Sequence, residues 1–268
     1  MQSIYTSRTI HYLQYTSGHR VTVTSDIIVE APMTLTVNGD AWLTFMCTPN
    51  DLDALAAGFL CNEGVIHSKN EIASLRVCPT GDNIDIWLDH SVDKPEYWRR
   101  TSGCTGGITA ADQIINNNVN LKEAYLTPTD IFELISLLLN IQSLYHKTGG
   151  IHTSALSDGK RLSVIAEDIG RHNTLDKIAG RCLLDDISPE RMILLTTGRV
   201  SSEMIQKSAQ MGASIVISRT SPTSLSIKMA DQWGLTLIGY ARRDSFRLYS
   251  HPERIIHTNQ SEDFVKEP

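Results

Sequence analysis

From about residue 150 onward, short apolar runs of strand character alternate with segments of helical character. The strand-like runs read GIHTSAL, RLSVIAE, MILLTT, SIVISR and LTLIGYA, and FRLYS follows near the end. Between them we predict helices over residues 173–183, 201–211 and 223–233. This alternation is typical of βαβ units, so it restricts the second half of the chain to the α/β class, in a chain that is α+β as a whole.

The first 100 residues favour strands instead. Runs rich in β-branched and aromatic residues predict two hairpins, one turning at Ser17-Gly18 and the other at Asn38-Gly39. Two more short strands are predicted near residues 73–78 and 83–88. This part of the chain should therefore form a smaller, strand-rich unit.

Two helices are predicted outside the alternating region. The first covers residues 51–63, with Asn50 or Asp51 as its N-cap and Gly64 as its terminator. The second begins at Thr127-Pro128, where a capping residue precedes a proline at the first helical position. Its sequence, DIFELISLLLNIQSLYHK, is apolar around most of the helix circumference. We therefore expect this second helix to be central rather than peripheral.

The polar, proline-containing stretch HSVDKPEYWRR is a plausible boundary between the two halves. A glycine-rich segment, TSGCTGG, and a polar stretch follow it. We predict a strand-rich N-terminal domain over residues 1–100, a cysteine loop and linker over 101–127, an α/β domain over 128–257 and a tail over 258–268.

Composition and charge exclude several classes of protein. A chain of 268 residues can bury a sizeable core, and 41% hydrophobic residues exclude wholesale disorder. No apolar run approaches the roughly 18 residues of a membrane span, and the sequence MQSIYTSRTIHYLQ has no apolar signal region. A net charge of −6 argues against nucleic acid as the main partner, because binding its phosphates requires dense positive charge. We expect a cytoplasmic protein without membrane or nucleic-acid contacts.

Polar, glycine-bearing segments follow four of the strand-like runs. Ligands of open α/β sheets bind beyond the carboxyl ends of the strands, so these segments are candidate binding loops. They carry arginines, whose planar guanidinium groups suit phosphate, and helix N-termini that would add backbone N–H groups. The set predicts an anion site, with a solvated charged surface as the alternative. Its members are Arg171, His172, Arg199, Arg219, Arg242 and Arg243, with Arg247 and Arg254 close behind.

Two histidines lie at predicted strand ends. His172 closely follows the acidic pair Glu167-Asp168, and a carboxylate beside a histidine can orient it and raise its pKa for acid–base chemistry. The alternative is a helix start in which Asp168 or Asn173 caps and His172 merely packs. His152 follows two glycines at a strand start and is equally ambiguous.

Five cysteines are present, an odd number without C-x-x-C spacing, so neither a disulfide framework nor a zinc site is predicted. Cys104 stands apart, because glycines surround it in the segment TSGCTGG and Arg99 and Arg100 precede it. Such a setting favours a reachable thiolate, the nucleophilic form, with an unreactive loop cysteine as the alternative. The other four lie in apolar surroundings and are interpreted as packing residues: Cys47, Cys61, Cys78 and Cys182.

Several stretches of the chain resemble the FdhD family, the formate dehydrogenase accessory proteins that are also called sulfur carrier proteins. The resemblance runs in order from about residue 20 to 256, and EDIGRHN and SRTSPTS are its most specific parts. The matching stretches are GFLCNEGVI, TGGIHTSAL, EDIGRHNTLDKIAG, TTGRVSSEMIQKSAQMG, SRTSPTSLSIKMA and GLTLIGYARRDSFRLYSHPERI.

The resemblance implies a function and a fold. Members of this family receive sulfur from a cysteine desulfurase as a persulfide. They pass it to the molybdenum (or tungsten) bis(molybdopterin guanine dinucleotide) cofactor that formate dehydrogenase requires, and a guanine nucleotide such as GDP mimics that cofactor. The family fold is similar to that of cytidine deaminase, and its members form homodimers. The implied activity is a sulfurtransferase-like one.

The resemblance also assigns roles to residues of this sequence. Cys104 matches the carrier cysteine of the family's loop, and the stretch that binds the cofactor matches Tyr240, Ala241, Arg242, Arg243, Asp244 and Ser245. The usual loop carries a second cysteine as C-x-x-C, but glycine stands at position 107 here. A persulfide on Cys104 then has no neighbouring thiol to release it as a local disulfide.

Two other functions remain as alternatives. A cofactor-binding chaperone could deliver the cofactor without moving sulfur, and the missing second cysteine favours it. A zinc hydrolase would require H-x-E followed by P-C-x-x-C, and the sequence His251-Pro252-Glu253 is followed by no cysteine. Zinc is therefore not expected.

Overall fold

The structure is a computed structural model that describes residues 5–80, 82–95, 98–100, 108–110, 120–188 and 191–256. Its largest sheet has six strands in the order β10-β9-β11-β12-β13-β14. Strands β11, β12 and β13 run parallel, whereas β9 is antiparallel to β10 and β11, and β14 is antiparallel to β13. The strands are β9 (His152–Ser157), β10 (Leu162–Asp168), β11 (Ile193–Thr196), β12 (Ile215–Ser218), β13 (Thr236–Gly239) and β14 (Arg247–Ser250).

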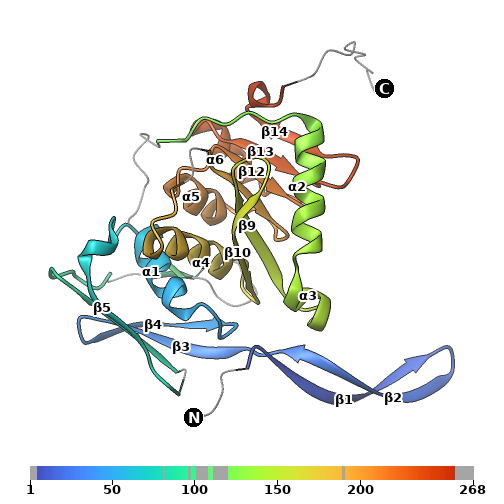
Figure 1. Cartoon of the computed structure of the whole chain (residues 1–268), viewed down its shortest axis with the longest axis horizontal. Helices are drawn as coiled ribbons and strands as arrows, with labels where there is room; N and C mark the ends of the chain where they lie inside the picture. Colours follow the sequence, from blue (N-terminus) through green and yellow to red (C-terminus); the bar gives the residue numbers. More distant parts are fainter. Residues whose placement is uncertain are drawn as a thin grey trace.

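Helices cover both faces of the six-stranded sheet (Figure 1). Leu194 and Val216 belong to the core on one face, and their neighbours Ile193 and Ile215 to the core on the other, as the alternation of side chains along a strand requires. The α/β class and the predicted strands are confirmed, although only β11 to β13 form βαβ units. On one face lies α2 (Pro128–Asn140); on the other lie α4 (Arg171–Leu184), α5 (Ser202–Gln210) and α6 (Ser224–Gln232).

The apolar helix that was expected to be central lies at the surface. Its start is as predicted, since Thr127 forms a capping box with Asp130. The helix ends at Asn140, and a short α3 (Ser143–Thr148) follows. A helix on a sheet contacts it along one stripe, so α2 buries Ile131, Leu134, Ile135 and Leu138. On its outer side Leu137 stays 42% exposed.

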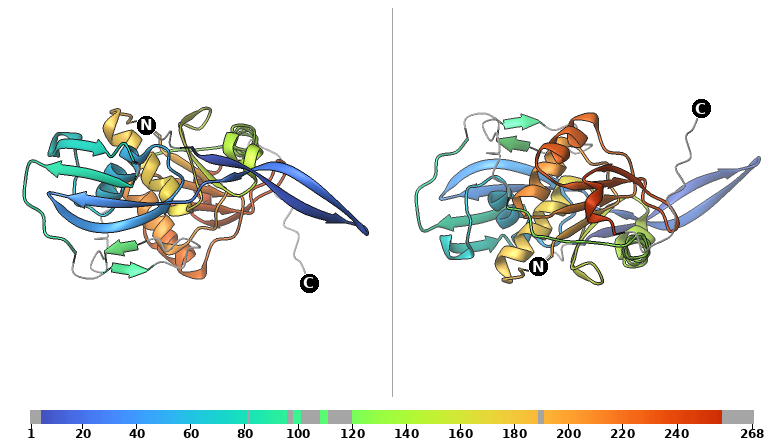
Figure 2. Two further views of the ribbon diagram at one scale, coloured as in Figure 1. Left: turned by 90° about the horizontal axis from the view of Figure 1, so that it is seen from below. Right: turned by 90° about the horizontal axis from the view of Figure 1, so that it is seen from above.

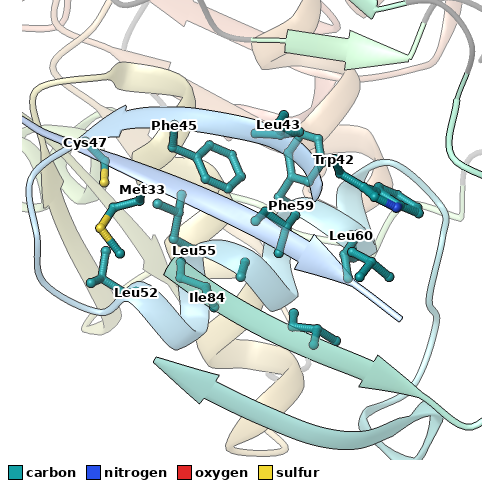
Figure 3. Packing of buried hydrophobic residues seen from close by; sticks show 14 of the residues in the cluster. Met33, Trp42, Leu43, Phe45, Cys47, Leu52, Leu55, Phe59, Leu60 and Ile84 are labelled. Carbon is teal, nitrogen blue, oxygen red and sulfur yellow. The ribbon is translucent and has the colours of Figure 1, made fainter. Parts of the chain in front are cut away.

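A second sheet, in the order β4-β3-β6-β5, packs against α1 (Leu52–Asn62). Figure 3 shows their shared core, which includes Phe45 and Phe59. The two rings pack edge to face, and their centroids are 5.2 Å apart. The second hairpin is confirmed, with both Asn38 and Gly39 at the positive φ of a tight β-turn. The strands are β3 (Ala31–Val37), β4 (Asp40–Cys47), β5 (Ile72–Val77) and β6 (Asn83–Leu88), and the 3-10 turn η1 (Lys69–Glu71) precedes β5.

Asp51, one of the two expected cap residues, is at the N-cap of α1, but its side chain does not cap the helix. Asp51 adopts a left-handed φ of 48° and accepts no capping hydrogen bond. Its carboxylate instead accepts a hydrogen bond from Arg181 of α4, at 2.5 Å. The carboxylate of Asp51 therefore binds Arg181 of another helix instead of the N–H groups of α1.

The central helix of the molecule is α4, which lies between α1 and the six-stranded sheet (Figure 1). Every residue from Arg171 to Gly180 is buried, although this segment is largely polar. Gly58 and Gly180 permit the contact with α1, because a Cβ on Gly58 would overlap the carbonyl oxygen of Asp176 and one on Gly180 would overlap that of Ala54. The two helices thus cross backbone against backbone.

Two charged residues of α4, Asp176 and Lys177, form buried ion pairs. Lys177 binds Asp168 at 2.6 Å, with side chains 1% and 0% exposed, and it also donates to the carbonyl oxygen of Thr48 at 3.1 Å. Asp176 accepts two hydrogen bonds of 2.6 Å from Lys207 of α5. Buried charges are tolerated only when they are paired and hydrogen-bonded in this way. The first pair also joins the segment after β4 to the end of β10.

The first predicted hairpin forms an arm that projects from the body, as both views of Figure 2 show. It consists of β1 (Ser7–Thr16) and β2 (His19–Ile28), and Lys147 of α3 donates to Ser7 Oγ at its base, at 2.8 Å. Further elements are the antiparallel pair β7 (Trp98–Arg100) and β8 (Ile108–Ala110) and the 3-10 turn η2 (Pro252–Arg254). Within the described ranges, none of the helices has the length and apolar character that crossing a bilayer demands. The domain boundaries at residues 100, 127 and 257 stay predictions.

We predict that Gly58→Ala destabilises the chain. Alanine favours a free helix over glycine by about 1 kcal/mol, but overpacking a core costs about 1–3 kcal/mol, and here the added methyl group meets rigid backbone. Chemical denaturation should show a net loss of about 1 kcal/mol or more. Gly150→Ala is the control, because a Cβ there would meet only Ile28 Cγ2, at 3.7 Å. A more stable Gly58→Ala variant would contradict the backbone contact.

We also predict that Lys177→Met lowers the free energy of unfolding by about 3–5 kcal/mol, because it leaves the carboxylate of Asp168 buried without its cation. Lys69→Met is the matched control, since Lys69 pairs with Asp186 at the surface and such pairs contribute about 1 kcal/mol or less. Equal stability of the two variants in a denaturation series would refute the structural role of the buried pair.

Candidate functional site

Several strand ends meet at one edge of the six-stranded sheet. Because β10 and β11 are both antiparallel to β9, they point the same way, and β12 and β13 run parallel to β11. The carboxyl ends of β10, β11, β12 and β13 therefore share an edge with the start of β9 at His152. This is the edge at which the sequence predicts binding loops.

A pocket of about 300 Å³ lies at this edge. We call it the strand-end pocket. Two arginines line it, and none of the described lining residues is Asp or Glu. Its lining consists of Gln142, Tyr145, Ile151, His152, Thr197, Arg219, Thr220 and Arg242.

The two arginines of the pocket lie close together. Arg242 donates from Nη1 to the backbone carbonyl oxygen of Arg219 at 2.6 Å, which fixes its guanidinium group beside that residue. Burial lowers the pKa of Arg219, and the neighbouring charges of Arg242 and Arg243 lower it further. The Nε of Arg219 is buried and has no hydrogen-bond partner among the described residues. Cations held together without a carboxylate favour the binding of an anion.

Hydrogen bonds to backbone groups hold the loops that carry these arginines. Ser218 Oγ donates to the carbonyl oxygen of Gly198 at 2.7 Å and accepts from the N–H of Thr220 at 3.0 Å. Tyr240 adopts a left-handed φ of 51°, and its N–H donates to the carbonyl oxygen of Thr220 at 3.0 Å. The turns after β11, β12 and β13 are thus tied to one another, so that the pocket is preformed.

Glu167, at the end of β10, positions the wall that α3 contributes. Its buried carboxylate accepts hydrogen bonds from the N–H groups of Leu144 and Tyr145, at 2.9 and 3.2 Å, and from Ser143 Oγ at 2.8 Å. A carboxylate at a helix N-terminus satisfies free N–H groups and is favoured there electrostatically. It holds Tyr145 at the pocket.

His152 lines the pocket and lies beside the start of α4. A Cβ on Gly198 would come within 2.9 Å of Arg171 Cβ and 3.5 Å of His152 Nδ1, so the glycine makes room for both side chains. Burial lowers the pKa of His152, and the charge of Arg171 lowers it further. The imidazole is therefore neutral at pH 7.

His172 is buried beside a carboxylate, but that carboxylate is Glu203 rather than Glu167 or Asp168. Its Nε2 lies 3.1 Å from Glu203 Oε2 and 3.2 Å from Ser201 Oγ. Both partners meet the same ring nitrogen, whereas a serine–histidine–carboxylate relay requires opposite nitrogens. Burial lowers the pKa of His172 despite the opposing effect of Glu203, so the expected rise is absent. Here His172 packs.

The remaining predicted residues do not line the pocket. Tyr240 stacks with Arg247, whose guanidinium carbon is 4.3 Å from the ring centroid, and Ala241 is buried in the core. Asp244 accepts a hydrogen bond from Ser245 at 3.1 Å in the exposed turn that follows. Arg171 is buried, and Arg199 and Arg243 are exposed.

Several pocket residues were not predicted from the sequence. Thr197 and Thr220 lie in the predicted strand-end segments, and their hydroxyl groups could have been included on that ground. Gln142 and Tyr145 precede β9 and carried no sequence signal, because a break between α2 and α3 brings them to the pocket.

Cys104 lies outside the described residues. The four other cysteines differ in their surroundings: Cys47 is buried in the core, where burial raises the pKa of its thiol to about 12. Cys61 and Cys182 line a separate cavity of about 490 Å³, and burial raises the pKa of Cys182 to about 11. Cys78 Sγ lies 3.0 Å from Thr80 Oγ1. The raised pKa values make Cys47 and Cys182 poor nucleophiles.

Within the described ranges, no group of three or more His, Cys, Asp or Glu side chains could hold a metal ion. His251 and Glu253, the H-x-E pair, contact each other at 2.8 Å. The other ring nitrogen of His251 contacts the carbonyl oxygen of Asp231, also at 2.8 Å. Both ring nitrogens of this histidine therefore have partners within the chain.

Comparisons with known proteins identify the family. The model of the FdhD/NarQ family matches residues 28–256. The chain is 34% identical to a sulfur carrier protein FdhD of Staphylococcus haemolyticus, over 91% of this chain and 94% of that protein. It is 33% identical to the sulfur carrier protein FdhD of Staphylococcus aureus (strain MRSA252), over 92% and 96% of the two chains.

A solved structure agrees with this assignment. A crystal structure described as that of a formate dehydrogenase accessory protein from Desulfotalea psychrophila has a TM-score of 0.78 and 29% identity. The match covers 94% of this chain and all of that one. This chain therefore belongs to the FdhD/NarQ family, as its sequence motifs predicted.

Proposed function

We propose that this chain is a sulfur carrier for formate dehydrogenase that holds a phosphate-bearing cofactor in the strand-end pocket. The observation that carries the proposal is the pair Arg219 and Arg242 in a pocket without described carboxylates. The names of the relatives support the sulfur-carrier role. The two parts of the proposal, anion binding and sulfur transfer, can be tested separately.

The chemistry of the pocket suits a phosphate group. Guanidinium groups donate parallel hydrogen bonds to phosphate oxygens, and the buried Nε of Arg219 has a free donor for such an oxygen. The hydroxyl groups of Thr197 and Thr220 add neutral donors at the same place. An anion here would relieve the repulsion between the arginines.

The proposed ligand is the molybdenum bis(molybdopterin guanine dinucleotide) cofactor, as substrate of the sulfur transfer. At about 300 Å³ the pocket is at the lower limit of small-molecule sites, so it suits one nucleoside phosphate unit rather than the whole cofactor. GDP is therefore a suitable probe. The exposed segment that follows Tyr240, including Arg243 and Ser245, would extend the contacts.

Cys104 is the proposed sulfur carrier. Its thiolate would attack the terminal sulfur of the persulfide on a cysteine desulfurase, so that a new S–S bond forms on Cys104 and the desulfurase cysteine leaves as a thiolate. With glycine at position 107, the Cys104 thiolate is regenerated by direct attack of the acceptor or of an external thiol on the outer sulfur. A cysteine desulfurase, formate dehydrogenase and a second copy of the chain are the proposed partners, in the cytoplasm.

The alternative is a chaperone that binds and delivers the cofactor without moving sulfur. The single cysteine of the loop favours this alternative, because a second loop thiol is missing. Both functions require the strand-end pocket, and they differ only in whether Cys104 carries sulfur.

We predict that Arg219→Ala and Arg242→Ala each weaken GDP binding by roughly ten- to a hundredfold, because a charged hydrogen bond contributes about 1.5–3 kcal/mol. Isothermal titration calorimetry measures the affinities. Arg161→Ala is the control, since Arg161 lies in the turn between β9 and β10, at the other end of these strands. If the wild-type chain fails to bind GDP, or if both pocket variants bind it as the wild type does, the proposed anion site is refuted.

We predict that a cysteine desulfurase supplied with ³⁵S-cysteine labels the wild-type chain, that dithiothreitol removes the label, and that Cys104→Ala stays unlabelled. Cys78→Ala is the matched control and should be labelled like the wild type. Absence of label on the wild type, or equal label on Cys104→Ala, would rule out the carrier role. In that case intact GDP binding would leave the chaperone as the function.

A further inference from the structure

His152 is the one imidazole among the described residues of the strand-end pocket. As the first residue of β9, it is paired in register with Asp168 of β10. The backbone of His152 is therefore fixed by its pairing within the sheet. A titratable group at this place shares the pocket with Arg219 and Arg242, so it would meet the same ligand.

The groups around His152 include three arginines and two carboxylates, and both carboxylates are engaged by other partners. Arg171 and His172 face it from α4, and both disfavour its protonation. Asp168 favours protonation, but its carboxylate already accepts hydrogen bonds from the N–H groups of Thr48 and Gly170 and pairs with Lys177. The other titratable groups nearby are Arg219 and Arg242 across the pocket, Tyr145 on α3, and Glu167, which is engaged by α3 and Thr153.

We propose that His152 takes up one proton from solvent when a phosphate group enters the strand-end pocket, and that its imidazolium becomes a third cationic contact beside Arg219 and Arg242. The proposal rests on the anion-binding part of the function above. In the reaction, a neutral imidazole, the ligand and one proton give the complex, and an N–H bond is the only covalent bond formed.

The physical reason is a change in the sign of the local potential. An opposite charge within about 4–6 Å favours the charged form of a titratable group. A phosphate held by the arginines would supply negative charge to a histidine whose neighbouring carboxylates are already engaged by other groups. Proton uptake then adds attraction at a position where the unliganded chain avoids a third positive charge.

His172 does not compete for this role. Its Nε2 is already occupied by Ser201 and Glu203, and it does not line the pocket. Lys207 and Arg171 further disfavour its protonation. His172 should therefore keep its ionisation state when a ligand binds.

The proposal fixes the sign of a pH effect. The pKa of His152 is depressed in the chain alone and rises in the complex, so the complex binds more protons. Affinity for the phosphate ligand must then be constant below the pKa of the unliganded state. It falls as pH rises toward the pKa of the complex, by at most about tenfold per pH unit, and levels off above it.

The direct test is an NMR titration of the chain labelled with ¹³C-histidine, in which the His152 resonance is assigned by its loss in His152→Gln. The pKa of this resonance is measured without ligand and with saturating GDP. We expect the pKa to rise by about one unit or more upon GDP binding. A resonance whose pKa is unchanged in GDP-bound protein would overturn the inference.

Binding measurements provide the second readout. Between pH 6.5 and 8.5 the GDP affinity of the wild type should fall more steeply than that of His152→Gln. The variant also reports how the ionisation of GDP itself affects binding, since that ionisation is the same for both proteins. His90→Gln, which changes an exposed histidine beside Asp89, is the control and should follow the wild type. Identical pH profiles of wild type and His152→Gln would also overturn the inference.

Failure of anion binding and failure of proton uptake by His152 give different results in these experiments. If GDP does not bind the wild-type chain at any pH, the anion-binding function fails and the inference with it. If GDP binds and Arg219→Ala weakens it, but the ionisation of His152 does not change, the function stands and the inference alone is wrong.

Discussion

The buried pair between Lys177 and Asp168 is the interaction on which the rest of the structure depends. It lies where three parts of the chain meet: the segment after β4, the end of β10 and the helix α4. Asp168 also accepts hydrogen bonds from Gly170 and Asn173, so it shapes the entry into α4. Because both charges are buried, neither partner can move without leaving the other buried and without its counter-charge. The position of α4 is therefore sharply defined.

This constraint explains why the central helix is a polar one. An apolar helix can pack in several rotational settings, whereas α4 must satisfy each buried polar group with a specific partner. Asp176 pairs with Lys207, and Thr174 contacts Ser154 of the sheet at 2.7 Å. On the opposite side, Gly58 and Gly180 allow α1 to approach until the backbones touch. The small N-terminal sheet is thereby attached to the larger one.

The strand-end pocket follows from this arrangement. The N-terminus of α4 places Arg171 behind His152, while Glu167, the residue before Asp168, holds α3 and with it Tyr145. Arginines from the loops after β12 and β13 complete the wall. The paired charges of the fold thus lie behind the pocket, and Arg219 and Arg242 line it. The short acidic pair Glu167-Asp168 positions both α3 at the pocket wall and the start of α4.

Local patterns in the sequence determined the strands, the two hairpins, most helices, and the presence of Arg219 and Arg242 at strand ends, since turn chemistry and periodicity act within a few residues. They wrongly predicted α2 as the central helix instead of α4. Apolar periodicity carries no information on buried polar groups that are paired across distant segments. Only the tertiary structure decided that Glu203 rather than Asp168 faces His172, and that Tyr145 and His152 line one pocket with the arginines. These neighbours come from strands, helices and loops whose distance along the chain exceeds the range of any local signal.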